Sequence, residues 1–293
     1  MSLAADQHAI VLQAAHRIME ADGLLVASGA GMGVDSGLPD FRGRDGFWRA
    51  YPALGRAGLA FEKIANPAAF ARDATLAWGF YGHRLGLYRR TVPHAGFAML
   101  QRIGAAVRGG LFVFTSNVDG QFQKAGFDPQ ALVEVHGSIH HLQCQRGCHG
   151  EIWPADGFEP KVAEDDCRLL NEPPHCRHCG EIARPNILMF DDWNWLGSRT
   201  ASQESRLDDW LRGQHRPPLT VEIGAGTNVI TVRSFAEVIG GALIRINPEP
   251  ESALPAGALH LRCGALEGIA AIHRALAAAG FFNLAPPAAR GRT

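Results

Sequence analysis

The 293-residue chain has no large excess of charge of either sign. Its 28 lysines and arginines nearly balance its 29 aspartates and glutamates, for a formal net charge of -1, and charged residues make up 19% of the sequence. A protein that binds nucleic acid or an anionic membrane through its overall field needs a clear positive excess. The composition therefore predicts neither a nucleic-acid partner nor a membrane partner.

The chain also lacks long apolar runs. No window approaches the roughly 18 apolar residues that a membrane-spanning helix needs. The first residues, MSLAADQH, show no basic segment followed by an apolar one. We therefore expect a cytoplasmic protein, in which the six cysteines are better interpreted as reduced residues or metal ligands than as disulfides.

Short apolar segments without polar alternation predict strands that are buried on both faces of a parallel sheet. These segments are 23–27, 112–114, 132–135, 219–223 and 242–246. Most are separated by helix-length segments, and an amphipathic helix is expected before the first strand. The pattern predicts an α/β fold with a Rossmann-like, doubly wound parallel sheet.

The length allows one large domain with smaller insertions. We assign residues 46–104, which are rich in aromatic residues and arginine, to a helical insert. Residues 141–183 contain paired cysteines and little apolar periodicity, so we assign them to a smaller zinc-binding domain held together by the metal. The Rossmann-like domain then comprises 1–45, 105–140 and 184–280, and 281–293 form a tail.

A glycine-rich segment, SGAGMG at 28–33, follows the first predicted strand. Glycines at the end of a strand let backbone N–H groups approach an anionic ligand closely, which favours a dinucleotide site. The spacing differs from the G-x-G-x-x-G of dehydrogenases, and SGLPDFRG follows at 36–43. On the glycines alone, a turn that closes a βα unit is the alternative.

The whole block 28–43 resembles the opening motif of the sirtuin family. Three further blocks follow in that family's order: TSNVD at 115–119, EVHG at 134–137, and paired cysteines ahead of RPNILMF at 184–190. The resemblance implies an NAD-dependent protein-lysine deacylase. In that chemistry the acyl-lysine carbonyl oxygen attacks the ribose C1′ of NAD as nicotinamide leaves, and the acyl group is transferred to ADP-ribose.

The resemblance also implies roles for individual residues. His136 would be the general base, since a neutral imidazole can take a ribose proton at physiological pH. Asn117 would orient the ribose or a water, Asp119 would hold the nicotinamide amide, Phe41 would exclude water, and Arg42 would bind the pyrophosphate. The cofactor-binding residues implied in this way are Gly29, Ala30, Gly31, Asp40, Phe41, Arg42, Ser116, Asn117, Val118, Asp119, Gly224, Ala225, Gly226, Asn247, Pro248, Glu249 and Ala265.

Two cysteine pairs, Cys144 with Cys148 and Cys176 with Cys179, lie about 30 residues apart. The spacing is compatible with one tetrahedral four-thiolate zinc site. Because protein ligands would fill all four positions, the metal would be structural. Cysteines that are only reduced and buried are the alternative.

Tyr81 and Arg84 lie three residues apart in the helical insert, and hence on one helical face. This Tyr-x-x-Arg spacing resembles the desuccinylase and demalonylase branch of the family, where it implies recognition of a carboxylate on the acyl group. An arginine-rich helix face turned to solvent is the alternative. We therefore expect acyl-lysine proteins as substrates, with succinyl or malonyl groups favoured over acetyl.

The chain departs from the family pattern at Gly33, Ser116, 191–192 and 224–227. These departures keep open an ADP-ribosyltransferase or NAD glycohydrolase on the same fold, and a non-catalytic sensor of NAD or acyl-lysine. The presence of His136 together with Asn117 and Asp119 argues for deacylation, and the intact polar site residues argue against a sensor.

Overall fold

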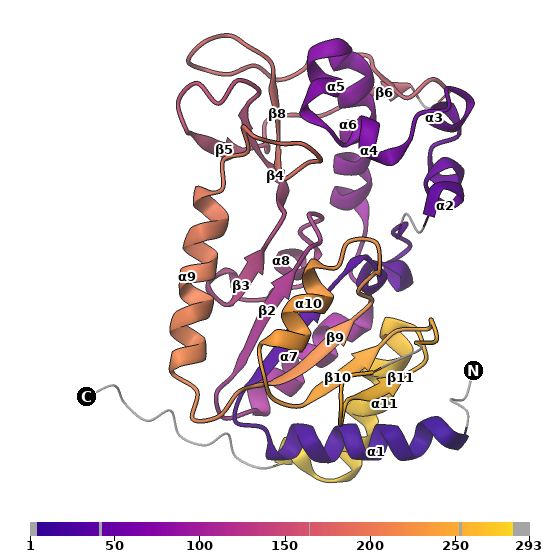
Figure 1. Cartoon of the computed structure of the whole chain (residues 1–293), viewed down its shortest axis with the longest axis vertical. Coiled ribbons are helices and arrows are strands. Elements are labelled where there is room, and N and C mark those ends of the chain that lie inside the picture. Colours follow the sequence, from indigo (N-terminus) through magenta and orange to yellow (C-terminus); the bar gives the residue numbers. More distant parts are fainter. Residues whose placement is uncertain (1–4, 41–42, 164, 252–253, 284–293) are drawn as a thin grey trace.

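The structure is a computed structural model that describes residues 5–40, 43–163, 165–251 and 254–283. A six-stranded parallel sheet forms the centre of the larger part (Figure 1). Its strands are β1 (Leu24–Ser28), β2 (Leu111–Thr115), β3 (Leu132–Glu134), β9 (Leu219–Ile223), β10 (Leu243–Ile246) and β11 (Leu259–Leu261). The spatial order β3-β2-β1-β9-β10-β11 is the 3-2-1-4-5-6 order of the doubly wound dinucleotide-binding fold. The predicted fold class is confirmed.

Helices cover both faces of this sheet. The residues of β1 are fully buried and alternate between the two layers: Leu24 and Val26 pack in one apolar cluster, and Leu25 and Ala27 in the other. This explains why the sequence of the strand is continuously apolar. The first layer contains α1 (Ala5–Glu20), α7 (Ala95–Ala106) and α11 (Ala265–Ala278), and the second contains α9 (Ser198–Arg212) and α10 (Thr231–Val238).

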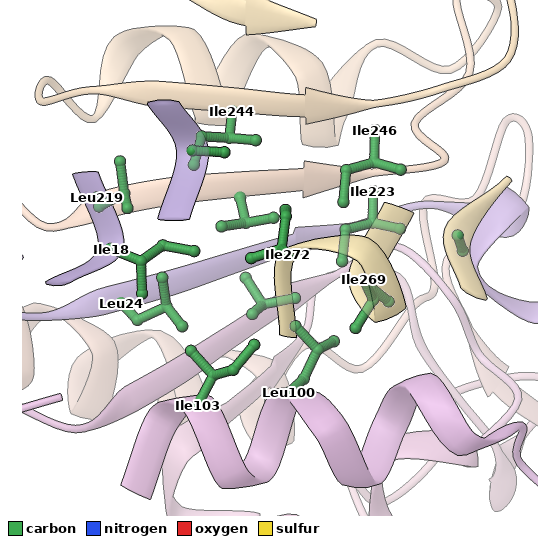
Figure 2. Packing of buried hydrophobic residues seen from close by; sticks show 14 of the residues in the cluster. Ile18, Leu24, Leu100, Ile103, Leu219, Ile223, Ile244, Ile246, Ile269 and Ile272 are labelled. Carbon is green, nitrogen blue, oxygen red and sulfur yellow. The ribbon is translucent and has the colours of Figure 1, made fainter. Parts of the chain in front are cut away.

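The first layer is packed mainly with branched aliphatic side chains. Figure 2 shows Ile18 of α1, Ile103 of α7 and Ile272 of α11 converging on Leu24 and Ile244 of the sheet. Each is at most 2% exposed, and full burial of such a side chain contributes about 1.5–3 kcal/mol. This packing fixes the strands whose carboxyl ends carry the candidate site.

A second apolar cluster joins the helical insert to the cysteine-containing segment. Trp78 lies at its centre, fully buried, and donates from Nε1 to the Ala183 carbonyl at 2.9 Å. Figure 1 shows the two segments together at one end of the molecule. The insert contains α2 (Gly43–Ala50), α3 (Pro52–Arg56), α4 (Phe61–Ile64), α5 (Pro67–Arg72) and α6 (Ala74–Arg90). The cysteine-containing segment contains an antiparallel sheet of β4 (Gly137–Cys144), β5 (Ile152–Pro154) and β8 (Ala183–Ile187), and a hairpin of β6 (Val162–Ala163) and β7 (Arg168–Leu169).

The packing of the elements differs from the proposed domain borders in several places. Helix α7 packs on the parallel sheet, although most of it lies within the proposed insert 46–104. Strand β4 begins at Gly137, ahead of the proposed start at 141. Phe281 is buried against the first layer, whereas it was assigned to the tail. The division into domains stays a prediction, with its borders moved to fit this packing.

Short elements complete the described chain: η1 (Ala30–Ser36), α8 (Gln121–Lys124), η2 (Pro129–Ala131) and η3 (Phe281–Asn283). Within the described ranges, none of the helices combines the length and apolarity needed to cross a membrane.

Candidate active site

Two glycine turns meet where the strand order of the sheet reverses, between β1 and β9. Gly31 donates its backbone N–H to the Gly224 carbonyl at 3.0 Å. A Cβ on Gly31 would lie 2.6 Å from the Gly224 Cα, and one on Gly29 would lie 2.7 Å from the Ala225 Cα. Gly224 has a φ of +61°, which also favours glycine. These glycines are therefore required by the contact between the turns, a reason that the sequence did not reveal.

The turn after β2 carries Asn117 and Asp119 to the same edge of the sheet. The Asn117 Nδ2 donates to the Gly29 carbonyl at 2.9 Å, which ties this turn to the first glycine turn. Asp119 is 8% exposed, and its Oδ1 accepts from the Gln121 backbone N–H at 2.9 Å. Burial raises the pKa of Asp119 to about 6, and the Gln121 hydrogen bond partly opposes that shift. A buried carboxylate in this position can accept hydrogen bonds from an amide group.

His136 follows β3 and precedes β4 at this edge. Its Nε2 lies 3.3 Å from the Thr231 Oγ1 at the start of α10, and the ring also hydrogen-bonds the Ser116 backbone. Burial lowers the pKa of His136 below its usual value, and the Ser116 contact partly opposes this. The imidazole is therefore neutral at pH 7 and able to accept a proton. Thr231 had no signal in the sequence, because only the fold brings it to the histidine.

Gly137, next to this histidine, is required by the backbone of β8. Its φ is +79°, and a Cβ there would lie 2.1 Å from the Asn186 carbonyl oxygen. The Leu188 N–H also donates to the His136 carbonyl at 2.9 Å. Pairing with the segment after β8 therefore holds the backbone on which the imidazole is mounted.

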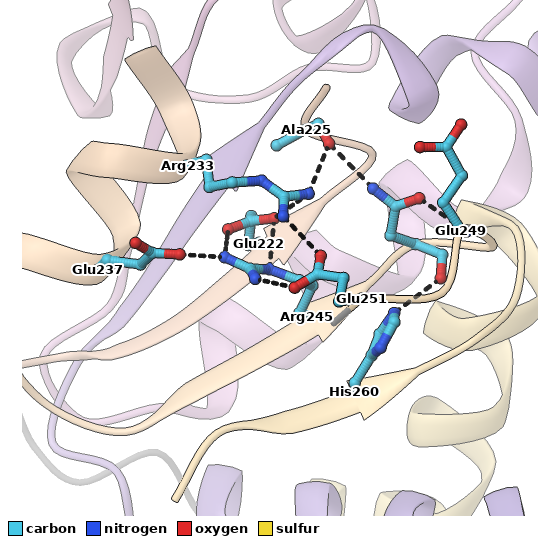
Figure 3. Close-up of polar contacts among 9 residues, drawn as sticks. Glu222, Ala225, Arg233, Glu237, Arg245, Glu249, Glu251 and His260 are labelled. Carbon is cyan, nitrogen blue, oxygen red and sulfur yellow. Dashed lines mark hydrogen bonds and ion pairs between the residues drawn. The ribbon is translucent and has the colours of Figure 1, made fainter. Parts of the chain in front are cut away.

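A buried ionic network supports the other end of the site (Figure 3). Arg245 and Glu222 are at most 1% exposed and share two hydrogen bonds of 2.8 and 2.7 Å. Glu237 and Glu251 also pair with Arg245, and Arg233 pairs with Glu251 at 2.6 Å. Removal of one partner from such a network leaves an uncompensated buried charge. The network therefore fixes β9, β10 and α10 against one another.

Asn247 connects this network to the second glycine turn. Its Nδ2 donates to the Ala225 carbonyl at 2.9 Å, and Arg233 donates to the same carbonyl at 3.2 Å. The Asn247 side chain is thus buried and occupied within the protein, whereas Pro248 and Glu249 are exposed beside it. Their contact with the cofactor stays a prediction.

The remaining predicted cofactor residues are distributed around these turns. Ala30 is exposed at the start of η1, Gly226 is exposed after β9, and Ala265 is buried in the first turn of α11. Ser116 is half-buried, Val118 is buried, and Asp40 is half-buried. Phe41 and Arg42 lie outside the described residues.

Arg84 and Tyr81 are buried in α6, so the solvent-facing alternative is wrong. The Arg84 Nε and Nη2 donate to the Tyr88 hydroxyl at 3.0 and 2.7 Å. The guanidinium carbon lies 5.3, 5.9 and 5.4 Å from the ring centroids of Phe80, Tyr81 and Tyr88. Aromatic rings at these distances stabilise a desolvated cation. The charge of Arg84 also acts on the pKa of Asp119, which places the two groups within electrostatic range.

Asp192 accounts for one departure from the family pattern. Its side chain is fully buried and forms an ion pair of 2.7 Å with the equally buried side chain of Arg184. Its carboxylate also accepts from the Asn194 backbone N–H at 3.2 Å. This aspartate therefore shapes the loop after β8 from within.

The four predicted metal ligands come together at one end of the antiparallel sheet. Their sulfur atoms all lie within 4.8 Å of one another, with Cys144–Cys179 at 3.7 Å and Cys148–Cys176 at 3.5 Å. A tetrahedral zinc ion with Zn–S bonds of about 2.3 Å has S–S edges of roughly 3.8 Å. The residues therefore fit a structural four-thiolate zinc site, which would join the end of β4 to the turn before β8.

Comparisons with known proteins agree with this geometry. The family model described as "Sir2 family" matches residues 29–205, more than half of the chain. A Thermus thermophilus protein named NAD-dependent protein deacylase is 30% identical over 88% of this chain and 92% of its own. A Pyrobaculum aerophilum protein named NAD-dependent protein deacylase 2 is 32% identical over 79% of this chain and 82% of its own. A solved Sir2 homologue–NAD complex superposes with a TM-score of 0.70, at 26% identity over 91% and 94% of the two chains. The chain belongs to the Sir2 family, the sirtuins.

Proposed function

We propose that this protein is an NAD-dependent protein-lysine deacylase that transfers the acyl group to ADP-ribose and releases nicotinamide. The observation that carries the proposal is a neutral, half-buried His136 at the same edge of the sheet as Asn117, Asp119 and the two glycine turns. The deacylase names of relatives at 30% and 32% identity support it. From the sequence alone, we also propose that it works in the cytoplasm.

The protein's own groups have separate tasks in this reaction. NAD, when bound, supplies the electrophilic ribose carbon and the leaving nicotinamide. His136 takes the proton of a ribose hydroxyl, because its lowered pKa keeps the imidazole neutral. Asp119 holds the amide of nicotinamide, and Asn117 orients the ribose from its fixed position on the Gly29 carbonyl. Because the pKa of His136 is lowered, the rate should fall only at a pH below that at which an ordinary histidine is protonated.

We propose further that the enzyme prefers acidic acyl groups such as succinyl and malonyl. Arg84 presents a planar guanidinium among three aromatic rings, a setting in which charge-assisted pairing with a carboxylate is strong. Val118 of the candidate catalytic turn belongs to the same apolar cluster as Tyr81. A substrate acyl chain that reaches this cluster would bring its carboxylate to Arg84.

The test is turnover of NAD with acetyl-, succinyl- and malonyl-lysine peptides, with products identified by mass spectrometry. The Arg84→Met variant should lose about 1.5–3 kcal/mol of acidic-substrate binding. This corresponds to a rise in KM of roughly 10- to 150-fold. Tyr81→Phe should act in the same direction with a smaller effect, and Arg90→Met, at an exposed position of the same helix, is the matched control.

Acetyl-lysine turnover separates the outcomes. If Arg84→Met leaves it nearly unchanged, the variant is folded and the loss is specific to the carboxylate. Equal losses on acetyl and succinyl peptides would contradict the acidic preference and make Arg84 structural. Free ADP-ribose without an acylated product would instead indicate an NAD glycohydrolase. ADP-ribose attached to a protein would indicate an ADP-ribosyltransferase.

A further inference from the structure

A cavity of about 550 Å³ lies next to the candidate active site. It is open to solvent on one side and is lined by β3, β4, α8, η2, the first turns of α9 and the carboxyl end of α6. Among the described residues, its lining includes Asp119 but neither His136, Asn117 nor the glycine turns. The volume falls within the range of about 300–1,000 Å³ that is typical of small-molecule sites. The cavity is therefore separate from the candidate active site except at Asp119.

The wall shared by the two sites is a tightly packed turn. The Asp119 carbonyl accepts a hydrogen bond from the His140 Nε2 at 3.0 Å. Gly120 has a φ of +70°, and a Cβ there would lie 2.7 Å from the His140 ring. The Gln121 side chain donates to the Tyr88 carbonyl at 3.0 Å. A ligand in the cavity would therefore contact a fixed backbone rather than a loose loop.

The lining carries more positive than negative charge. Arg89, Lys124 and Arg199 are three cations, against the single carboxylate of Asp119 among the described lining residues. Arg89 donates to two backbone carbonyls, Phe158 at 2.6 Å and Ala155 at 2.8 Å, which hold it in position. It also pairs with the exposed Glu159 at 3.1 Å, which offsets part of its charge. Arg199 is held by the buried Glu134, which offsets part of its charge.

Burial lowers the pKa of both histidines of β4 beside these cations. Burial, and then the charge of Arg199, lower the pKa of His141 to about 4. The pKa of His140 is lowered mainly by burial; the hydrogen bond to the Asp119 backbone opposes this shift, and Arg89 adds a smaller lowering. Glu134 and Asp156 act in the opposite direction on both rings without reversing the shift. Both imidazoles are therefore neutral at pH 7, and Arg89, Lys124 and Arg199 are the cationic side chains of the described lining.

We propose that this cavity binds a small metabolite through a carboxylate or phosphate group. Guanidinium and ammonium groups bind both anions by charge-assisted hydrogen bonds. The cavity is larger than either anionic group alone, so the remainder of the metabolite would fill the space beside Gln123 and Ser138. The bound metabolite would contact the turn that carries Asp119 from the side opposite the candidate active site.

Gln123 allows a test that leaves the fold intact. It lines the cavity and is half-buried, and its side chain makes no hydrogen bond to the described residues. Gln123→Glu adds a negative charge to the cavity, and Gln123→Lys adds a positive one. The matched control is Gln13→Glu, at an exposed position of α1 on the helical layer that covers the parallel sheet.

The experiment is a titration of the full chain with inorganic phosphate and, separately, with succinate, followed by the backbone amide resonance of Gly120 in NMR spectra. Saturating ADP-ribose is present to occupy the proposed cosubstrate site. We expect saturable binding of at least one anion, with a Kd about fivefold higher in Gln123→Glu, lower in Gln123→Lys and unchanged in Gln13→Glu. The tighter anion identifies the group that the cavity prefers.

The proposal is overturned if neither anion gives saturable shifts at Gly120, or if the Kd is the same in both Gln123 variants. Shifts that appear only without ADP-ribose, at Gly29 and Gly31, would also overturn it, because they would place the anion in the proposed cosubstrate site. Failure of ADP-ribose itself to bind would contradict the proposed function and leave the titration of the cavity valid.

Discussion

Replacement of Asp119 by asparagine should stabilise the protein in a pH-dependent way. Burial raises the pKa of Asp119 from its usual 3.8 to about 6, roughly two pH units. Since one unit corresponds to about 1.36 kcal/mol, the ionised carboxylate costs the folded state about 3 kcal/mol. The unfolded chain loses this proton first, so the cost grows as the pH rises from 4 to 6 and is constant above that. Asp119→Asn removes the charge and keeps an oxygen acceptor for the Gln121 N–H.

The expected gain in the free energy of unfolding is about 3 kcal/mol at pH 8 and roughly half of that at pH 5. Urea unfolding at both pH values, with the same zinc concentration throughout, measures it. The control is Asp128→Asn, at an exposed aspartate whose Oδ1 also accepts from the backbone N–H two residues on, at 2.9 Å. Deacylation by Asp119→Asn should fall at the same time, because functional carboxylates are often held at a cost in stability. An equal gain at both pH values, or no gain at pH 8, would refute the reasoning.

The other predictions concern the metal and the glycine turns. The purified protein should contain about one zinc per chain. Cys176→Ser should lower the zinc content and speed proteolysis within 141–183 before it affects NAD binding. Active protein without zinc would contradict this prediction. Gly31→Ala should destabilise the protein by about 1–3 kcal/mol and raise the KM for NAD, because its Cβ would overlap the Gly224 backbone. The control is Gly157→Ala, where no atom lies within 4 Å of the added Cβ. It should leave the stability in thermal melts and the KM for NAD unchanged. Equal effects of the two substitutions would contradict the account.

The sequence predicted the parallel sheet because its strands are continuously apolar. The predicted strand 219–223 coincides with β9, and the first predicted strand differs from β1 by one residue. Strand β11 was not predicted, because it is three residues long and carries His260 at its centre. Short strands of this kind are identified by their pairing partner, here β10, rather than by periodicity.

The candidate site was predictable only where chemistry and spacing coincide in the sequence. The four cysteines are an example, since paired thiolates have few other uses at that spacing. The reason for glycine at 29 and 31 was not available, because it depends on the approach of a turn nearly 200 residues away. The burial of Arg84 could not be predicted either, because polar and apolar residues are mixed around α6 and no side of the helix is clearly apolar. Burial and long-range contacts of this kind set pKa values, and residue order does not reveal them.

The most direct test of the central claim is the deacylation rate of His136→Ala. The variant should bind NAD with nearly unchanged affinity, while formation of acyl-ADP-ribose from an acyl-lysine peptide falls by about a hundredfold or more. His215→Ala, at an exposed histidine, should retain the full rate. Deacylation by His136→Ala at close to the unmodified rate would remove this histidine from the reaction and contradict the account.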